Sequence, residues 1–411
     1  MKVTGEEMAY IVQRALQDGF IDPLKDTAVL FQSWDVLAHR INVLRRVWPG
    51  VHHAIPIKTQ PHTEVLQRLV AWGVGLEAAS LEEVQYALAA KCPASYLLFD
   101  SPVKTHSEIA WCHANAPGMV LNANSLEELS RHPTAPSYRL GLRINPEIYT
   151  GAPTFFHVSN DGSKFGVAIS RRKEVLQAID RYPISGLHMH SGSQITCIDR
   201  QIEALAALVD LAYEANARLE SAGLERRIAW LDIGGGIPAE PWEIMEFYAA
   251  QAVKILRGCG NVLEIYTEFG QWVHAEAGWA LSAVEYVLPR SKGNPHVAFI
   301  HLGADYFLRD VYTTPRSFPL TVLHSDGRLC SSQSSQSYNV AGPLCFGGDY
   351  LAHAVLLPEL HEGYWLAIGH TGANTYGLWS RHCSRTVPKM IGYSIYNEGL
   401  ISILSERRAE K

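Results

Sequence analysis

The 411-residue sequence lacks several features that would point to particular classes of protein. Its seven cysteines are scattered and form no Cys-x-x-Cys pair, which argues against a disulfide framework and against a zinc site. No window approaches the roughly 20 apolar residues of a membrane-spanning helix. Basic residues do not outnumber acidic ones, and the net charge of −6 gives no reason to expect nucleic acid or an anionic membrane as a partner.

The N-terminal residues 1–7 (MKVTGEE) carry acidic groups where a secretory signal needs a basic start and an apolar run. Together with the unpaired cysteines, this favours a cytoplasmic protein without a bound metal. The composition, 47% hydrophobic and 18% charged, is typical of a globular protein. A chain of this length predicts two domains, because a single core seldom grows so large.

From about residue 51 onward, short apolar runs alternate with amphipathic segments of helical periodicity. The runs are His53–Ile57, Val74–Ala78, Ser95–Phe99, Gly118–Leu121, Arg139–Ile144, Ser185–His190, Ile228–Ile233 and Val262–Thr267. The expected helices include Thr63–Trp72, Leu81–Ala90 (opened by a capping box at Ser80), Ser125–Arg131 and Ile202–Ala222. Eight such alternations fit a parallel (β/α)₈ barrel, although periodicity alone leaves a doubly wound open sheet as an alternative.

After about residue 272 the pattern changes to strand-like runs separated by turn residues. These runs are Ala280–Leu288, His296–Leu302, Pro319–His324, Tyr364–Ile368, Met390–Ile395 and Leu400–Leu404, with an earlier one at Ala28–Gln32. They predict an antiparallel β domain. We therefore expect a barrel over residues 33–272. Residues 273–411, together with the N-terminal segment 1–32, are expected to form the β domain.

Residues with chemical potential fall at the ends of the barrel runs. Lys58 ends the first run, Glu77 the second and His190 the sixth, while Gly234–Gly236 follows the seventh and Glu268 the eighth. Each has an ordinary explanation, because lysines are usually solvated, glycines usually make turns and a glutamate often caps a helix. In a barrel, however, the carboxyl ends of the strands converge on one mouth, so the five positions together favour a shared site.

The chemistry of these groups is coherent. A glycine-rich loop that opens a helix presents backbone N–H groups to a phosphate. A lysine in a partly desolvated mouth can hold an aldehyde as a Schiff base. A carboxylate can keep a pyridine nitrogen protonated, and an imidazole can stack on the ring. Phosphate, aldehyde, ring nitrogen and ring face together describe pyridoxal 5′-phosphate (PLP).

At these residues the sequence resembles the fold-type III PLP-dependent decarboxylases, which include diaminopimelate, ornithine and arginine decarboxylases. The similarity extends from about Ala28 to Tyr396 and is strongest to the diaminopimelate branch. The segments that carry it, in order, are IPIKTQPHTE (55–64), GLEAASLEE (75–83), NANSLEEL (122–129), RINP (143–146), SKFG (163–166), LHMHSGSQ (187–194), LDIGGGIP (231–238), EFGQ (268–271) and GPLCFGGD (342–349).

The resemblance implies a role for each matching position. Lys58 would bind the cofactor aldehyde, and His190 would stack on its ring. Ser193 and the glycines at Gly234, Gly235 and Gly236 would hold the phosphate, and Glu268 would pair with the ring nitrogen.

Further implied roles lie outside the barrel. Cys345 in the β domain would reach across a homodimer interface and act as the general acid, although a buried, inert cysteine is the alternative. The implied reaction is loss of CO₂ from an amino acid, followed by protonation of the same carbon by Cys345 or Lys58.

The sequence also departs from the family pattern. An acidic residue usually follows the cysteine and pairs with a distal substrate ammonium, whereas here Phe346 follows it. The usual Glu-Pro-Gly-Arg is replaced by a segment ending in Gly270 and Gln271, so that an arginine is missing from the expected cofactor contacts. These differences predict a retained cofactor site and a rebuilt substrate pocket.

Two other expected contacts are displaced. The position of a tyrosine that usually contacts the phosphate holds Asn374, and Tyr376 two residues later is a candidate substitute. Arg309 and Tyr312 roughly replace a substrate-binding arginine and tyrosine, with Arg309 as a candidate clamp for a carboxylate.

We therefore expect an amino-acid decarboxylase whose substrate lacks a free distal ammonium, as in specialised or siderophore-type biosynthesis. A PLP racemase or another α-carbon enzyme on the same fold is the second hypothesis, because such an enzyme needs a base on each face of the substrate. A non-catalytic relative that binds a protein partner is the third. Loss of the Schiff-base lysine would favour that third hypothesis, and Lys58 is present.

Overall fold

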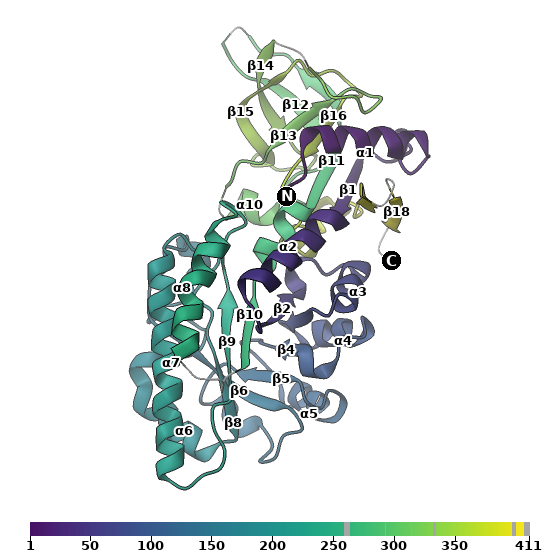
Figure 1. Ribbon diagram of the computed structural model, residues 1–411. Coiled ribbons are helices and arrows are strands. Elements are labelled where there is room, and N and C mark those ends of the chain that lie inside the picture. The colour runs from purple at the N-terminus through teal and green to yellow at the C-terminus, as the bar shows by residue number, and fades with distance from the viewer. Residues whose placement is uncertain (259–263, 292, 314, 332–333, 397–399, 407–411) are drawn as a thin grey trace. The chain divides into compact units, whose positions relative to one another are not determined.

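The structure is a computed structural model that describes residues 1–258, 264–291, 293–313, 315–331, 334–396 and 400–406. The chain divides into two compact units (Figure 1). The barrel unit comprises residues 42–272, and the β unit comprises residues 1–41 and 273–411. That the predicted segments 33–272 and 273–411 with 1–32 fold as independent domains stays a prediction.

Parallel strands close on themselves in the barrel unit. They are β2 (His52–Pro56), β3 (Gly75–Ala78), β4 (Leu97–Phe99), β5 (Val120–Ala123), β6 (Arg139–Asn145), β8 (Ile184–His188), β9 (Trp230–Gly235) and β10 (Glu264–Glu268), with the short β7 (Val167–Ala168) beside β6. Pairing of β10 with β2 closes the ring, which confirms the barrel and excludes the open sheet. All eight predicted runs contribute a strand, although residues 262–263 of the last run lie outside the described residues.

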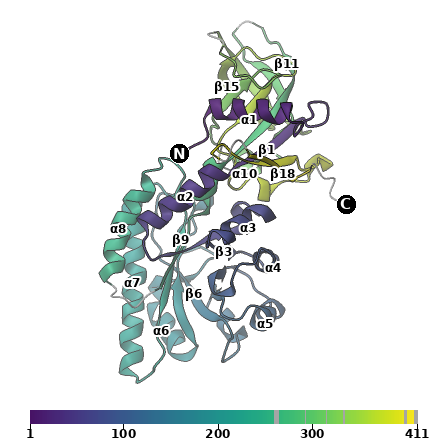
Figure 2. The same cartoon turned by 45° about the vertical axis from the view of Figure 1, so that its right-hand side comes forward.

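Helices follow most of the barrel strands, and Figure 2 shows several of them on the outside of the sheet. They are α3 (Thr63–Ala71), α4 (Leu81–Ala89), α5 (His106–Asn115), α6 (Arg172–Arg181), α7 (Ile198–Ser221) and α8 (Ile244–Gly258), with α2 (Trp34–Val47) before β2. Five shorter 3₁₀ turns are η1 (Ile57–Thr59), η2 (Ala94–Tyr96), η3 (Glu128–Arg131), η4 (Thr154–Phe156) and η5 (Ile169–Arg171).

Two details of the helix prediction change. Ser80 caps α4 as expected by accepting the N–H of Glu83, but the Glu83 carboxylate accepts the N–H of Ala79 at 2.7 Å. The helix predicted over residues 125–131 is instead the 3₁₀ turn η3. A tight turn forms there because Glu128 bends back into the protein, where it accepts the N–H of Asn124 and pairs with the buried Lys104 at 3.0 Å.

The amino-terminal half of the barrel interior is filled by aromatic and small residues. Trp230 of β9 lies against Gly186 and Gly141, where an added Cβ would come within 2.0 Å and 2.3 Å of the indole ring. Trp230 and Tyr266 contact edge to face, and both belong to one buried apolar cluster. Such a plug stabilises the barrel and leaves the polar groups to gather toward the carboxyl ends of the strands.

The β unit is built on a mixed sheet. Its strands are β1 (Ala28–Ser33), β11 (Gly278–Leu288), β12 (His296–Ile300), β13 (Leu320–Leu323), β14 (Ser335–Ala341), β15 (Tyr350–Pro358), β16 (Trp365–Ile368), β17 (Lys389–Ser394) and β18 (Leu400–Ser405). Most pairs are antiparallel, as expected, but β1 with β17 and β12 with β14 are parallel. Parallel neighbours need a long connection, and the barrel, which lies between β1 and β17 in the sequence, supplies one.

Both faces of this sheet are covered. Trp279 and Leu281 of β11 pack in a cluster with residues of α1 (Gly5–Gln17), while Ala280 between them packs in a second cluster. This alternation is the two-residue period of a strand buried on both sides. The unit also holds α9 (Gly270–His274, which begins in the barrel unit), α10 (Leu308–Tyr312), η7 (Ala275–Ala277), η8 (Tyr376–Leu378) and η9 (His382–Ser384). No helix in the described segments is long and apolar enough to span a membrane.

Candidate active site

Lys58 stands at the carboxyl end of the first barrel strand, in the turn η1 that follows β2. Its ammonium donates to the carboxylate of Glu77, which is fully buried in the neighbouring strand β3. Desolvation lowers the pKa of Lys58, but the negative charges of Glu77 and Glu268 outweigh it and raise this pKa above its usual value. Burial in turn raises the pKa of Glu77, an effect that the neighbouring ammonium opposes.

Glu268 and His190 lie together at the same end of the barrel. Glu268 is the last residue of β10, and His190 comes two residues after β8, with 3.6 Å between His190 Nδ1 and Glu268 Oε2. The N–H of Gly235 also donates to His190 Nδ1, at 3.2 Å. Burial lowers the pKa of His190, so the neutral ring is favoured. Burial alone would raise the pKa of Glu268, but the neighbouring groups, His188 foremost, lower it to about 2.

The glycine-rich turn after β9 makes close backbone contacts. Gly234 and Gly236 adopt φ angles of 67° and 88°, which favour glycine. A Cβ at Gly235 would lie 2.1 Å from the carbonyl of Glu268, and one at Gly236 would lie 2.0 Å from the carbonyl of Gly192. The turn therefore packs directly on the segment that carries Ser193, as a cradle of backbone groups for a phosphate would require.

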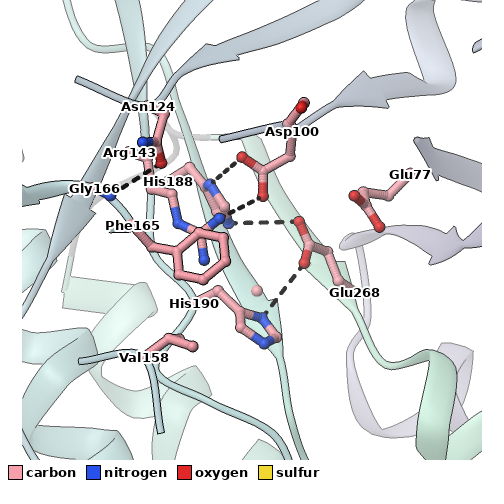
Figure 3. A network of polar contacts seen from close by, with 12 residues as sticks. Glu77, Asp100, Asn124, Arg143, Val158, Phe165, Gly166, His188, His190 and Glu268 are labelled. Carbon is pink, nitrogen blue, oxygen red and sulfur yellow. Dashed lines mark hydrogen bonds and ion pairs between the residues drawn. The ribbon is translucent and has the colours of Figure 1, made fainter. Parts of the chain in front are cut away.

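Side chains that the sequence analysis did not single out complete the barrel site (Figure 3). Asp100 follows β4 and pairs with Arg143 of β6 at 3.2 Å. His188, the last residue of β8, lies between Asp100 and Glu268, with nitrogen–oxygen distances of 3.3 Å and 3.5 Å. Asp232 of β9 is the register neighbour of His188 and is fully buried.

The charges of this group are interdependent. His188 and Arg143 lower the pKa of Asp100 in spite of its burial. Burial and the negative charge of Glu268 raise the pKa of Asp232 well above its ordinary value. The arrangement therefore favours the ionised forms of Asp100 and Glu268 and shifts Asp232 toward its protonated form.

A second layer holds Arg143 in place. The Arg143 guanidinium lies 4.5 Å from the centre of the Phe165 ring, a cation–π distance. The loop that carries Phe165 is fixed by Asn124, whose side chain accepts the N–H of Gly166 at 3.1 Å and donates to the carbonyl of Lys164 at 2.9 Å. The motif SKFG thus supports the charged cluster from one side, as Figure 3 shows.

Two predicted cofactor contacts lie directly after β10. A Cβ on Gly270 would meet the Thr59 hydroxyl at 2.3 Å, so the start of α9 packs against the turn that bears Lys58. Gln271 follows in the same short helix, at the place where the resemblance leads us to expect an arginine. Their contribution to cofactor binding stays a prediction.

The other predicted residues belong to the β unit. Cys345 and Phe346 lie in the loop between β14 and β15, and Cys345 is exposed. Phe346 stacks on Tyr312 of α10, with ring centroids 5.3 Å apart and planes 9° from parallel. His382 meets the same Phe346 ring at 6.3 Å and 90°. The loop around Cys345 is therefore bordered by aromatic rings.

Three further residues of the β unit were predicted to contact the substrate or the cofactor phosphate. Arg309 lies in α10 with Tyr312, and burial lowers the pKa of its guanidinium to about 10. Asn374 has a φ of 58°, and Tyr376 begins the turn η8 two residues later. Their proposed contacts with substrate or phosphate stay predictions.

The barrel residues fit PLP. A lysine beside a buried carboxylate, an imidazole, a second buried carboxylate and a glycine turn of close backbone contacts meet at one end of the strands. These groups match the aldehyde, ring face, ring nitrogen and phosphate of that cofactor. Fold and site together define the barrel class of PLP enzymes.

Comparison with known proteins identifies the family within this class. Residues 35–278, more than half of the chain, match the family described as "Pyridoxal-dependent decarboxylase, pyridoxal binding domain". The chain belongs to this family, and it is a PLP-dependent amino-acid decarboxylase.

Individual relatives agree. The chain is 28% identical over 337 residues to diaminopimelate decarboxylase from Deinococcus radiodurans, covering 81% of each sequence. It is 27% identical over 350 residues to the Pseudomonas fluorescens enzyme, covering 82% of this chain and 80% of the relative. Among solved structures, Helicobacter pylori diaminopimelate decarboxylase complexed with L-lysine superposes with a TM-score of 0.82 at 23% identity, covering 96% of this chain and 97% of that one. This last likeness concerns the fold alone.

Proposed function

We propose that the protein decarboxylates an amino acid whose side chain carries no free distal ammonium. In this proposal the barrel retains the cofactor-binding residues of the family. The loop that carries Cys345 and Phe346 lacks the acidic residue that would pair with the second ammonium of a diamine. The relatives with detectable sequence similarity include diaminopimelate decarboxylases, so the proposed difference lies in the substrate pocket and not in the reaction.

Each barrel group has a proposed role toward the cofactor. Lys58 would hold the aldehyde carbon, His190 the ring face and Glu268 the ring nitrogen, while Ser193 and the turn Gly234–Gly236 would hold the phosphate. Bound there, PLP supplies an electron sink for the pair of electrons that remains when CO₂ leaves. Cys345, or Lys58 after the substrate amine has displaced it, would donate a proton to the carbon that lost the carboxylate. The net products are CO₂ and an amine.

The observation that carries the substrate proposal is the stack of Phe346 on Tyr312. The residue after Cys345 is the position at which the family resemblance implies an acidic group. Here its ring is engaged face to face at 5.3 Å with another aromatic ring. An ammonium brought to this surface would lose water without meeting a carboxylate, which is unfavourable.

The acidic residues near this stack in the sequence are already engaged. Asp349 is buried and accepts the backbone N–H groups of Ala304 and Leu344 at 2.6 Å and 2.7 Å. Asp310, next to Arg309 in α10, pairs with Arg316 at 2.7 Å. Both carboxylates therefore support the loops of the β unit and are poor candidates to replace the missing acid.

We further propose that the enzyme is a homodimer with active sites shared between subunits. The support is the family resemblance, in which the cysteine of one subunit serves the cofactor of the other. We also propose a cytoplasmic location, supported by the free thiols of Cys92, Cys112, Cys197, Cys330, Cys345 and Cys383, since a reducing compartment keeps thiols unpaired.

A substrate screen tests the proposal. Purified enzyme loaded with PLP is assayed for CO₂ release from amino acids with apolar, amide or acylated side chains, and in parallel from diaminopimelate, lysine and ornithine. Mass spectrometry then identifies the amine. We expect turnover in the first group and at most trace turnover in the second. Turnover of diaminopimelate that exceeds all neutral substrates would contradict the proposed pocket.

A further inference from the structure

His188 occupies an unusual position, because both of its ring nitrogens face a carboxylate. Nδ1 lies 3.3 Å from Asp100 Oδ1, and Nε2 lies 3.5 Å from Glu268 Oε1. The side chain is completely buried, and Figure 3 shows the ring between the two acids. Both contacts are within ion-pair distance, and none of the four atoms has a hydrogen-bonding partner among the described residues.

This geometry distinguishes between the protonation states of the ring. A neutral imidazole carries one N–H and would turn a lone pair toward the second carboxylate. A protonated imidazole presents one N–H to each acid and carries a positive charge that compensates both, as buried charges require. The positive ring also completes an alternating chain of charges, in which Arg143 pairs with Asp100, and Asp100 and Glu268 flank His188.

The other charged or titratable groups around the ring agree with this state. Arg143 and Asp232 are the register neighbours of His188 on β6 and β9. The Arg143 cation would repel a charged imidazole, but Asp100 lies between them and contacts both. Burial and the negative charge of Glu268 raise the pKa of Asp232, which weakens its competition for the positive ring.

His190 differs from His188 although both contact Glu268. Its Nδ1 accepts the N–H of Gly235, so that nitrogen presents a lone pair and has no proton to offer to Glu268 Oε2. Glu268 Oε1 therefore contacts His188, whereas Glu268 Oε2 receives no hydrogen bond from His190. Glu268 thus has a structural reason to stay ionised.

We propose that Asp100 and His188 are positioning residues that hold Glu268 ionised and oriented for the ring nitrogen of the cofactor. This rests on the proposed pairing of Glu268 with that nitrogen. A single proton between Glu268 and the nitrogen can reside on either partner. The cation on His188 contacts the carboxylate directly and lowers its basicity, so the proton resides on the nitrogen, where it makes the ring an effective electron acceptor.

The test uses nuclear magnetic resonance of the holoenzyme rather than activity alone. Protein labelled with ¹⁵N-histidine, loaded with PLP labelled with ¹⁵N in its ring, reports the protonation of both partners. His188→Gln removes the ring and assigns its signals. Asp100→Asn retains the size of the side chain and removes the charge that favours the protonated imidazole. His53→Gln is the matched control, because His53 is a buried barrel histidine that bonds to the Thr267 hydroxyl at 2.7 Å and contacts no carboxylate in the proposed site.

In the native enzyme at neutral pH we expect an N–H signal from each nitrogen of His188 and from the cofactor ring nitrogen. In Asp100→Asn under the same conditions, one of the two His188 N–H signals should be lost, and the protonated fraction of the ring nitrogen should fall. Its kcat should fall about tenfold with KM unchanged, the size expected for loss of one charge-assisted contact. His53→Gln should match the native enzyme in both spectra and in kcat.

The outcomes separate this inference from the proposed function. A native His188 with a single N–H overturns the inference, and this result needs no variant. A native ring nitrogen that is unprotonated contradicts the Glu268 pairing itself. A ring nitrogen that is protonated in native and Asp100→Asn enzymes alike, with the cofactor normally attached to Lys58, leaves the pairing intact and overturns the role of Asp100 and His188.

Discussion

The two groups of candidate site residues differ in how firmly the fold holds them. In the barrel unit, Glu77, Asp100, His188 and Glu268 are almost fully buried, and each contacts a charged or titratable neighbour. In the β unit, Cys345 is exposed and Tyr312 retains 55% of its exposure, although its ring stacks on Phe346. The barrel site is a network of coupled charges, whereas the β-unit site is a surface loop.

This difference explains where sequence change is tolerated. Replacing one buried charge in the barrel would leave a partner without compensation, at a cost of several kcal/mol. A surface loop can exchange an acid for a phenylalanine with little effect on folding, because the half-buried position has no buried charged partner. Family membership is therefore visible in the barrel segments, and the change of substrate proposed for this chain lies in the loop.

The largest expected effect concerns the barrel. Lys58→Ala should abolish covalent attachment of PLP and reduce kcat/KM by about 10²–10⁴-fold, because it removes both the attachment point and a candidate proton donor. Borohydride reduction followed by peptide mapping of the native enzyme should find the pyridoxyl group on Lys58. Lys173→Ala, an exposed lysine on α6, is the control and should retain full activity. A label on another lysine would show that the site has been assigned wrongly.

The second prediction joins the two units. Lys58→Ala and Cys345→Ala proteins should each be nearly inactive, but an equal mixture that exchanges subunits should recover about a quarter of native activity, since half of the dimers then carry one intact site of two. Activity and subunit exchange are measured on the same mixture, the latter by mass spectrometry. A mixture that exchanges subunits and stays inactive would rule out shared sites.

The third prediction concerns specificity. An ammonium at Phe346 could recover about 1–2 kcal/mol from cation–π contact, against about 3–5 kcal/mol for a buried charge without its partner. The difference disfavours diamine substrates by about a hundredfold in kcat/KM. Phe346→Glu should lower KM for diaminopimelate and lysine, whereas Phe346→Gln, which is similar in size to the glutamate variant and uncharged, should not. Equal effects of the two variants would show that space and not charge excludes diamines.

Much of the fold could be predicted from periodicity. The barrel strands are short buried runs between amphipathic segments, and this pattern is local to the sequence. The β unit was harder, because β14 begins with polar residues (Ser335 to Ser337) and β15 exposes Leu356 while burying Leu351 and Leu357. Neither strand shows a regular alternation, so both were missed. Parallel pairing in the sheet depends on contacts between distant segments and leaves no local signal.

The candidate site could be predicted in part for the same reason. Lys58, His190 and Glu268 stand where apolar runs end, and a strand end in a barrel is a known place for chemistry. Asp100 directly follows the run Ser95–Phe99, and a search for every polar residue after a run would have found it. His188 lies inside the run Ser185–His190, where it could not be told from an ordinary strand residue. Their pairing follows from the barrel closing between strands far apart in the chain, which the sequence does not display.

The smallest predicted effect tests the loop itself. Tyr312→Ala removes the stack on Phe346, and such aromatic pairs contribute about 0.5–1.5 kcal/mol. If the stack orders the substrate wall, KM for the preferred substrate should rise about twofold to tenfold while kcat changes little, because the barrel machinery is untouched. Tyr312→Phe retains the ring and should behave like the native enzyme, which separates stacking from the hydroxyl. A fall in kcat with constant KM would instead place Tyr312 among the groups that act on the reacting atoms. Tyr312 would then belong functionally with the barrel residues, and the loop could not be described as a substrate-binding wall alone.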